Sequence, residues 1–123
     1  MPEDNKKKQI YIVDDDESVC RALKILLMTY GFEVSTFLSA EKFFNAVPNS
    51  VQGCLLLDIH MPGLDGWEVL KRIIKSGSRR SVIIISADKN EGLRKQALIT
   101  GAVGFFQKPV NGQELVDLIN KTY

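Results

Sequence analysis

Two uninterrupted apolar runs constrain the fold of this 123-residue chain more than any other feature. Residues 54–57 (CLLL) lead directly into Asp58, and residues 82–85 (VIII) lead into Ser86. A strand that is apolar at every position has both faces buried, which is typical of a parallel sheet with helices on both sides. Ligands bind beyond the carboxyl ends of such strands, so Asp58 becomes a candidate site residue. Taken alone, Asp58 also fits a simpler role as the cap of a turn before Pro62.

Strand-like and helix-like segments alternate along the whole chain. Strand patterns occupy residues 9–13, 32–37, 54–57, 81–86 and 103–106, and a helical pattern follows each of them. Helix starts are predicted at Ser39, at Asp65 with Glu68, at Asp88 or Asn90, and at Asn111 with Glu114. The third helix is predicted to bury Trp67, Leu70, Ile73 and Ile74. This order predicts an α/β domain of three layers, with a doubly wound sheet of five parallel strands between helices.

Composition excludes several classes of protein. A net charge of +1 with 45% hydrophobic and 25% charged residues is ordinary for a globular domain, and it gives no reason to expect direct nucleic-acid binding. No apolar stretch approaches the roughly 20 residues of a membrane span, and the first residues lack an apolar signal segment. We therefore expect a cytoplasmic protein without membrane contact. Residues 1–8 are interpreted as a flexible polar tail, and residues 9–123 as the domain.

Polar groups from four strands should converge at one edge of the sheet, because parallel strands end on the same side. These groups are the Asp14–Asp16 run, Asp58, Ser86 and Lys108. Two carboxylates 4 Å apart repel by about 4 kcal/mol at an effective dielectric constant near 20, unless a cation lies between them. Oxygen ligands without a His or Cys cluster suit Mg²⁺, with Mn²⁺ as a substitute. A cation, a lysine, a hydroxyl and a forward-pointing carboxylate together indicate phosphoryl transfer to Asp58.

These motifs resemble those of two-component response regulator receiver domains, in the CheY-like superfamily. The resemblance covers nearly the full length and rests on VDD at 13–15, LD at 57–58, MPG at 61–63 with DG at 65–66, SA at 86–87 and KP at 108–109. The segments VDDD, MPGLDG and GFFQKP are most similar to the FixJ-like subgroup. The resemblance implies the flavodoxin-like strand order 2-1-3-4-5.

The resemblance also implies roles for individual residues. Asp58 would accept a phosphoryl group from a phosphohistidine on a sensor histidine kinase, and Lys108 would neutralise that group. Asp15, Asp58 and the backbone carbonyl of His60 would bind Mg²⁺, and Asp14 would act through a water molecule. The His60 side chain would lie exposed beside the site.

Ser86 and Phe105 match the switch hydroxyl and the switch aromatic residue of the family. The charge of about −1.5 to −2 added by phosphorylation would draw Ser86 and Lys108 toward Asp58, and Phe105 would fill the vacated space. The output face would combine the helix after Asn90, the strand at 103–106 and the last helix. A phosphorylation-dependent homodimer through the first two of these elements, and control of transcription by a DNA-binding domain beyond residue 123, follow from the resemblance.

Other classes fit less well. A nucleotide or flavin enzyme needs a loop after the first strand that cradles phosphate, and the acidic residues 14–17 would repel phosphate. A haloacid-dehalogenase-type phosphatase carries a second aspartate two residues after its nucleophile, where this chain has His60. A receiver-like interaction module that works without phosphorylation, alone or in a longer chain, stays as the alternative. A receiver would not be an enzyme beyond catalysing phosphorylation and dephosphorylation of its own aspartate.

Overall fold

Five β-strands form one parallel sheet in the computed structural model, which describes residues 8–61, 65–77 and 80–122. The strand order is β2-β1-β3-β4-β5, and every neighbouring pair is parallel. The strands are β1 (Gln9–Val13), β2 (Glu33–Phe37), β3 (Cys54–Asp58), β4 (Ser81–Ser86) and β5 (Gly104–Gln107). The predicted fold class and strand order are confirmed. The second and fifth strands each begin one residue later than predicted.

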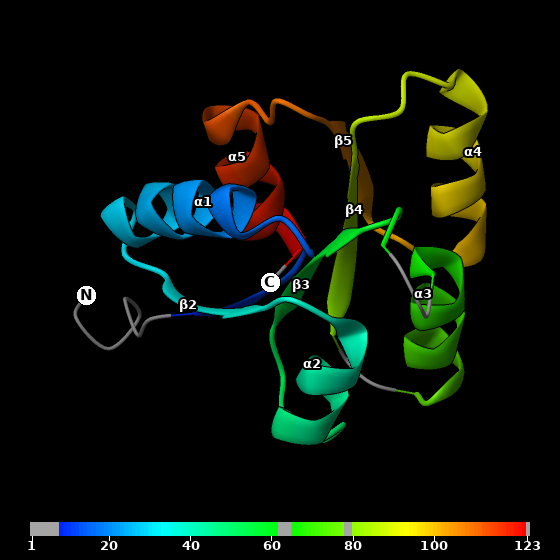
Figure 1. Ribbon diagram of the computed structural model, residues 1–123, viewed down its shortest axis with the longest axis horizontal. Coiled ribbons are helices and arrows are strands. Elements are labelled where there is room, and N and C mark those ends of the chain that lie inside the picture. Colours follow the sequence, from blue (N-terminus) through cyan, green and yellow to red (C-terminus); the bar gives the residue numbers. More distant parts are fainter. Residues whose placement is uncertain (1–7, 62–64, 78–79, 123) are drawn as a thin grey trace.

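Helices cover both faces of the sheet (Figure 1). α1 and α5 pack on one face, while α2, α3 and α4 pack on the other. Their bounds are α1 (Glu17–Thr29), α2 (Ala40–Ala46), α3 (Gly66–Lys75), α4 (Glu91–Thr100) and α5 (Gly112–Thr122). Within the described ranges, no helix is both long and apolar enough to cross a bilayer. Most of the predicted tail, and residues 62–64 of the motif after Asp58, lie outside the described residues.

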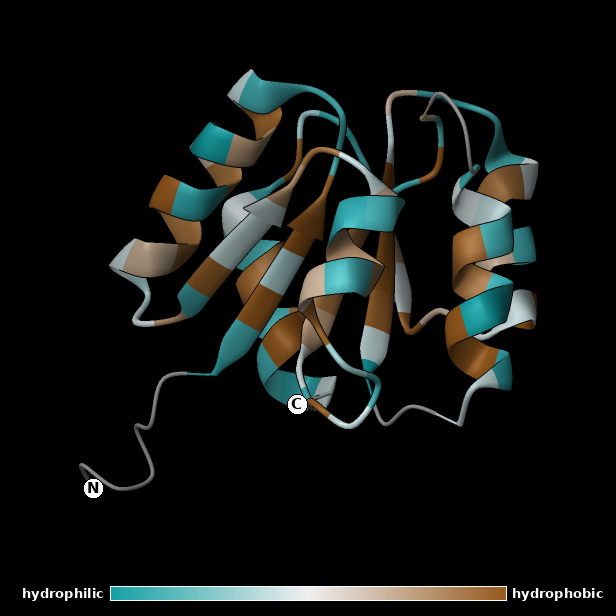
Figure 2. Ribbon diagram, turned by 60° about the horizontal axis from the view of Figure 1, so that its bottom comes forward, coloured by the Kyte–Doolittle hydropathy of each residue, from teal (hydrophilic) through white to brown (hydrophobic). Residues whose placement is uncertain are grey.

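The apolar run of β3 divides its side chains between two cores. Leu55 and Leu57 belong to the core beneath α2, α3 and α4, whereas Cys54 and Leu56 belong to the core beneath α1 and α5. All four side chains are fully buried. Burying one leucine side chain contributes about 1.5–3 kcal/mol, so a polar residue at any of these positions would be unfavourable. Figure 2 shows that hydrophobic residues make up most of the sheet, whereas hydrophilic residues alternate with hydrophobic ones along the helices.

Side chains cap the helices as the sequence predicts. Ser39, Asp65 and Asn111 accept hydrogen bonds from the amides of Lys42, Glu68 and Glu114, at 3.2, 3.0 and 3.0 Å. Of the two residues proposed for α4, Asn90 is the cap, because its Oδ1 accepts from the Gly92 amide at 2.8 Å.

One predicted core residue lies at the surface. Ile74 on α3 is 44% exposed, although Leu70 and Ile73 are buried. Ile74 instead covers Gly101, where an added Cβ would lie 2.8 Å from the Ile74 Cδ1. The apolar stripe of α3 therefore extends from the core to a contact with the end of α4.

Candidate functional site

The carboxyl ends of four strands bring the predicted polar residues together. Asp14 follows β1, Asp58 ends β3, Ser86 ends β4, and Lys108 follows β5. The Lys108 Nζ lies 2.9 Å from Asp14 Oδ2 and 3.6 Å from Asp58 Oδ2. Lys108 therefore lies between the two carboxylates, as expected from the shared edge of the sheet.

Burial and charge act together on these groups. Asp14 is fully buried, Asp58 is 4% exposed, and the Lys108 side chain is 20% exposed. Burial, and then the negative charge of Asp14, raise the pKa of Asp58 to about 6, against the opposing effects of the His60 amide and Lys108. Burial lowers the pKa of Lys108, but the two carboxylates outweigh burial and hold that pKa above its usual value. The site thus holds an excess of negative charge in a poorly solvated place.

Three carboxylates form a group that could hold a cation. One oxygen from each of Asp14, Asp15 and Asp58 lies within 4.8 Å of the other two. Asp15 is exposed, and Asp14 Oδ2 is a buried acceptor that makes an ion pair with Lys108 but no hydrogen bond within the described part of the chain. An oxygen-only group with excess negative charge fits a hard divalent ion such as Mg²⁺.

Backbone amides fix the two inner carboxylates. The Asp16 amide donates to Asp14 Oδ1 at 2.9 Å, and the His60 amide donates to Asp58 Oδ1 at 3.2 Å. Each bond leaves the Oδ2 atom turned toward Lys108. Asp16 itself caps α1 by accepting from the Ser18 and Val19 amides, so it belongs to the helix and not to the ligand group.

Two contacts near the site were not anticipated from the sequence. The His60 side chain is exposed, as expected, but its Nε2 lies 3.6 Å from Asp88 Oδ2, which joins the loops after β3 and β4. The Cys20 thiol donates to the Asp14 carbonyl at 3.3 Å and so supports the first acidic loop from α1. The spacing of these residues along the chain carries no signal for either contact, because one depends on how two loops meet and the other on how α1 packs against the loop after β1.

The predicted switch residues lie on adjacent strands. Ser86 is fully buried, and its Oγ accepts from the Asp88 amide at 3.0 Å. In the described part of the chain, no hydrogen bond joins Ser86 to Asp58. Phe105 is 6% exposed and belongs to the core beneath α4, so its ring already lies inward. The Lys108 amide donates to the Ser86 carbonyl at 2.8 Å, and this bond connects the ends of β4 and β5 near the three carboxylates.

Comparison with known proteins gives a consistent result. The family model for the response regulator receiver domain matches residues 10–120. The chain is 39% identical over 110 residues to TodT, a response regulator protein of Pseudomonas putida, which covers 89% of this chain and 48% of TodT. It is 37% identical over 113 residues to the transcriptional regulatory protein FixJ of Bradyrhizobium diazoefficiens, covering 92% of this chain and 55% of FixJ. The chain thus spans about half the length of these relatives.

Solved structures agree with the sequence matches. Full-length FixJ from B. japonicum superposes with a TM-score of 0.86 and 36% identity, covering 95% of this chain and 58% of FixJ. The isolated FixJ-N structure superposes with a TM-score of 0.85 and 29% identity, covering 95% and 94% of the two chains. Family model, relatives and fold therefore agree with the motifs at the strand ends, and the chain belongs to the response regulator receiver domain family of two-component systems.

Proposed function

We propose that Asp58 accepts a phosphoryl group from a phosphohistidine of a sensor histidine kinase. The observation that carries the proposal is the Asp58 carboxylate at the end of β3, oriented by the His60 amide and 3.6 Å from the Lys108 ammonium. In the transfer, an Asp58 oxygen forms a bond to phosphorus while the bond from phosphorus to the histidine nitrogen breaks. The electron pair returns to the imidazole of the kinase, and hydrolysis later releases inorganic phosphate and regenerates the carboxylate.

The ionisation of Asp58 suits this role. A nucleophilic carboxylate must be deprotonated, and a pKa of about 6 leaves Asp58 mostly ionised at pH 7–8. Its poor solvation leaves less hydration to be lost during attack. Asp15, Asp58 and the His60 carbonyl would hold Mg²⁺, and Asp14 would contribute through a water molecule. The ion would supply positive charge that neutralises the phosphoryl oxygens. Lys108, whose Nζ lies 3.6 Å from Asp58 Oδ2, would neutralise part of the remaining negative charge.

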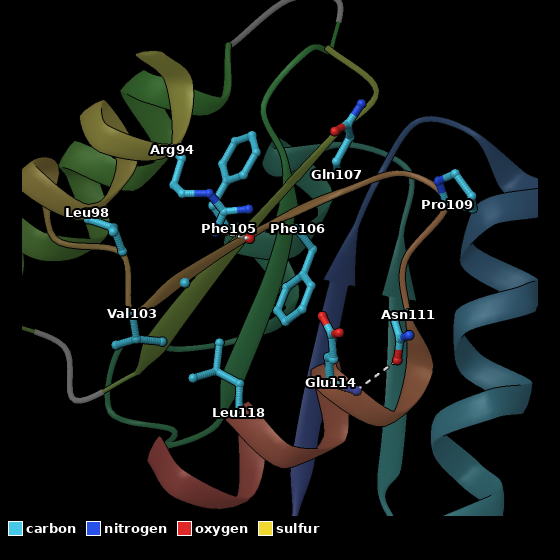
Figure 3. A pocket seen from close by; sticks show the side chains of 11 residues that line it. Arg94, Leu98, Val103, Phe105, Phe106, Gln107, Pro109, Asn111, Glu114 and Leu118 are labelled. Carbon is cyan, nitrogen blue, oxygen red and sulfur yellow. Dashed lines mark hydrogen bonds between the residues drawn. The ribbon is translucent and has the colours of Figure 1, made fainter. Parts of the chain in front are cut away.

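The proposed output face lies on α4, β5 and α5. Side chains from these elements line a cavity of about 530 Å³ (Figure 3), among them Arg94, Leu98, Val103, Glu114 and Leu118. Leu98, which lines this cavity, is 47% exposed, and its neighbour Ile99 on α4 is 77% exposed. Apolar exposure of this kind supports a phosphorylation-dependent homodimer through α4 and β5. By relation to the transcriptional regulator FixJ, the output would be transcription through a further domain.

The experiment that tests the proposal is intact-mass spectrometry after incubation with phosphoramidate and Mg²⁺. We expect one adduct of about 80 Da that is stable in acid and labile in base, as an acyl phosphate is, and we expect EDTA to prevent its formation. Peptide mapping should place the adduct on the segment that contains Asp58. No adduct under conditions that modify an established receiver would contradict the proposal and favour the phosphorylation-independent interaction module.

Replacing Ser86 with alanine should separate phosphorylation from its effect on the output face. The Ser86 hydroxyl is bonded to the Asp88 amide and not to Asp58, so Ser86→Ala should still form the adduct. The change in amide NMR shifts of α4 and β5 on phosphorylation should fall to less than about half, because the hydroxyl that would follow the phosphoryl group is missing. Ser81→Ala, at the other end of β4, is the control. A large loss of adduct in Ser86→Ala would show that its assigned role is wrong.

A further inference from the structure

Arg94 on α4 contacts the predicted switch residue Phe105 in two ways. Its Nη1 donates a hydrogen bond to the Phe105 carbonyl at 3.1 Å, and its Cζ lies 5.4 Å from the centroid of the Phe105 ring. Figure 3 shows the guanidinium reaching from α4 to the ring, with Phe106 on the other side of the strand. One side chain therefore holds both the backbone and the ring of the same residue.

The position of β5 makes this contact important. β5 is an edge strand, so carbonyls on its outer side have no strand partner, and Arg94 supplies the missing donor. In the described part of the chain, this is the only side-chain hydrogen bond between α4 and β5. The strand then leads within three residues to Lys108, which contacts Asp14 and Asp58. Arg94 thus joins α4 to the strand that ends at the acidic group.

The inward position of the Phe105 ring is not explained by a movement of Ser86. The Ser86 Oγ still accepts a hydrogen bond from the Asp88 amide, yet the Phe105 side chain is already buried, with 6% of its surface exposed. An alternative place for the ring is available, because the cavity of about 530 Å³ lies beside Phe105 and is lined by Leu98 and Leu118. An outward rotation into this space would break the contact between the ring face and the guanidinium, which is attractive because the cation faces the negative face of the ring.

We propose that Arg94 is a positioning residue that holds the Phe105 ring inward before phosphorylation. The link to phosphorylation rests on the proposed function, whereas the effect of Arg94 on the ring does not. Arg94 thereby biases the domain toward the ring position that phosphorylation of Asp58 favours. Phosphorylation then changes the position of the Phe105 ring only slightly. The output depends more on the structural change that phosphorylation produces at α4.

The test uses the full chain labelled with 4-fluorophenylalanine and followed by ¹⁹F NMR. The chain has six phenylalanines, and Phe105→Leu identifies the resonance of Phe105. In the wild type we expect one narrow Phe105 resonance that shifts little on adding beryllofluoride with Mg²⁺. In Arg94→Ala that resonance should split, shift or broaden, and beryllofluoride with Mg²⁺ should return it toward the wild-type position. The apparent affinity for beryllofluoride should fall roughly two- to fivefold, because the inward population is reduced.

Two control variants and one comparison distinguish the proposed positioning role of Arg94 from a general structural role. Lys95→Ala changes the neighbouring exposed residue on α4 and should leave the Phe105 resonance unchanged. Arg94→Lys keeps the charge but loses the planar group, so its spectrum should be intermediate. A merely structural role would disturb the other phenylalanine resonances as much as that of Phe105.

Two outcomes would overturn different conclusions. If the Phe105 resonance has the same position in Arg94→Ala and in the wild type, with and without beryllofluoride, the proposed positioning role of Arg94 is wrong. If the wild type does not bind beryllofluoride but the Phe105 resonance still changes in Arg94→Ala, the proposed function is wrong and the positioning role of Arg94 stands.

Discussion

Replacing Asp58 with asparagine is expected to abolish the phosphoryl adduct and to raise the free energy of unfolding by about 2 kcal/mol at pH 7.5. The second effect follows from the raised pKa of Asp58, which is about 6 in the folded domain against 3.8 for an ordinary aspartate. Burial and the charge of Asp14 make the ionised carboxylate unfavourable in the folded state. An amide carries no charge, keeps a similar shape and can still accept from the His60 amide.

The gain in stability should depend on pH in a defined direction. Below about pH 4 the carboxyl group is protonated in both states, so Asp58→Asn should differ little from the wild type. Between about pH 4 and 6 the unfolded chain loses its proton first, and the wild type becomes less stable relative to the variant. Above pH 6 the difference should be complete. Added Mg²⁺ should narrow it, because the ion binds the carboxylate form of the folded wild type.

Urea unfolding followed by Trp67 fluorescence from pH 4 to 8 measures this difference. Asp117→Asn is the matched control, because it removes one carboxylate from the exposed side of α5 and should leave stability within about 0.5 kcal/mol. An adduct of undiminished yield on Asp58→Asn would exclude Asp58 as the acceptor. A variant no more stable than the wild type at pH 7.5 would show that Lys108 compensates the acidic group fully.

Replacing Lys108 with methionine should have the opposite effect on stability. The Lys108 Nζ lies 2.9 Å from the fully buried Asp14, so its loss leaves a buried carboxylate without its counter-charge. Because Lys108 is partly exposed, we expect a loss of about 2–3 kcal/mol at pH 7.5, below the roughly 3–5 kcal/mol of a fully buried ion pair. The double variant with Asp14→Asn should recover most of this loss, since the uncompensated charge is then removed.

Two conditions should partly rescue Lys108→Met. Lower pH protonates Asp58, whose pKa is raised to about 6, and Mg²⁺ replaces part of the missing positive charge, so either should stabilise this variant more than the wild type. Lys71→Met is the control, because the Lys71 Nζ pairs with Glu68 at 3.8 Å on an exposed part of α3 and should change stability by less than about 1 kcal/mol. Equal losses in the two variants at pH 7.5 would contradict the electrostatic role of Lys108.

The sequence was sufficient to predict which residues meet at the edge of the sheet. Asp14, Asp58, Ser86 and Lys108 each stand at or just after the end of a strand, and parallel strands leave no alternative to their convergence. Their burial was less predictable. Asp14 and Asp15 are adjacent and chemically identical, yet Asp14 is fully buried and Asp15 is exposed. The direction of each side chain depends on the loop that follows β1, and the alternation along that strand ends before it.

Contacts between segments distant in sequence account for the remaining differences. The burial of Arg80, for which no prediction was made from the sequence, is of this kind. The side chain is 5% exposed because its Nε donates to the Val51 carbonyl at 2.9 Å and its guanidinium lies over Phe43. Ile74 fitted the apolar period of α3, but α4 approaches from the side and Ile74 packs there. Helical spacing identifies a stripe of side chains, but it does not identify which neighbouring element each side chain meets.

The alternation of side chains along β5 has a consequence for how this domain could change through insertions and deletions. Phe105 belongs to the core beneath α4 and Phe106 to the core beneath α5, although both are phenylalanines. A deletion of Gly104 that left the Val103 amide bonded to the Val82 carbonyl would move both phenylalanines back by one position and exchange their faces. The hydrophobic character of both cores would be kept, but a different ring would then face Arg94. The register of β5 therefore determines which phenylalanine faces the Arg94 guanidinium.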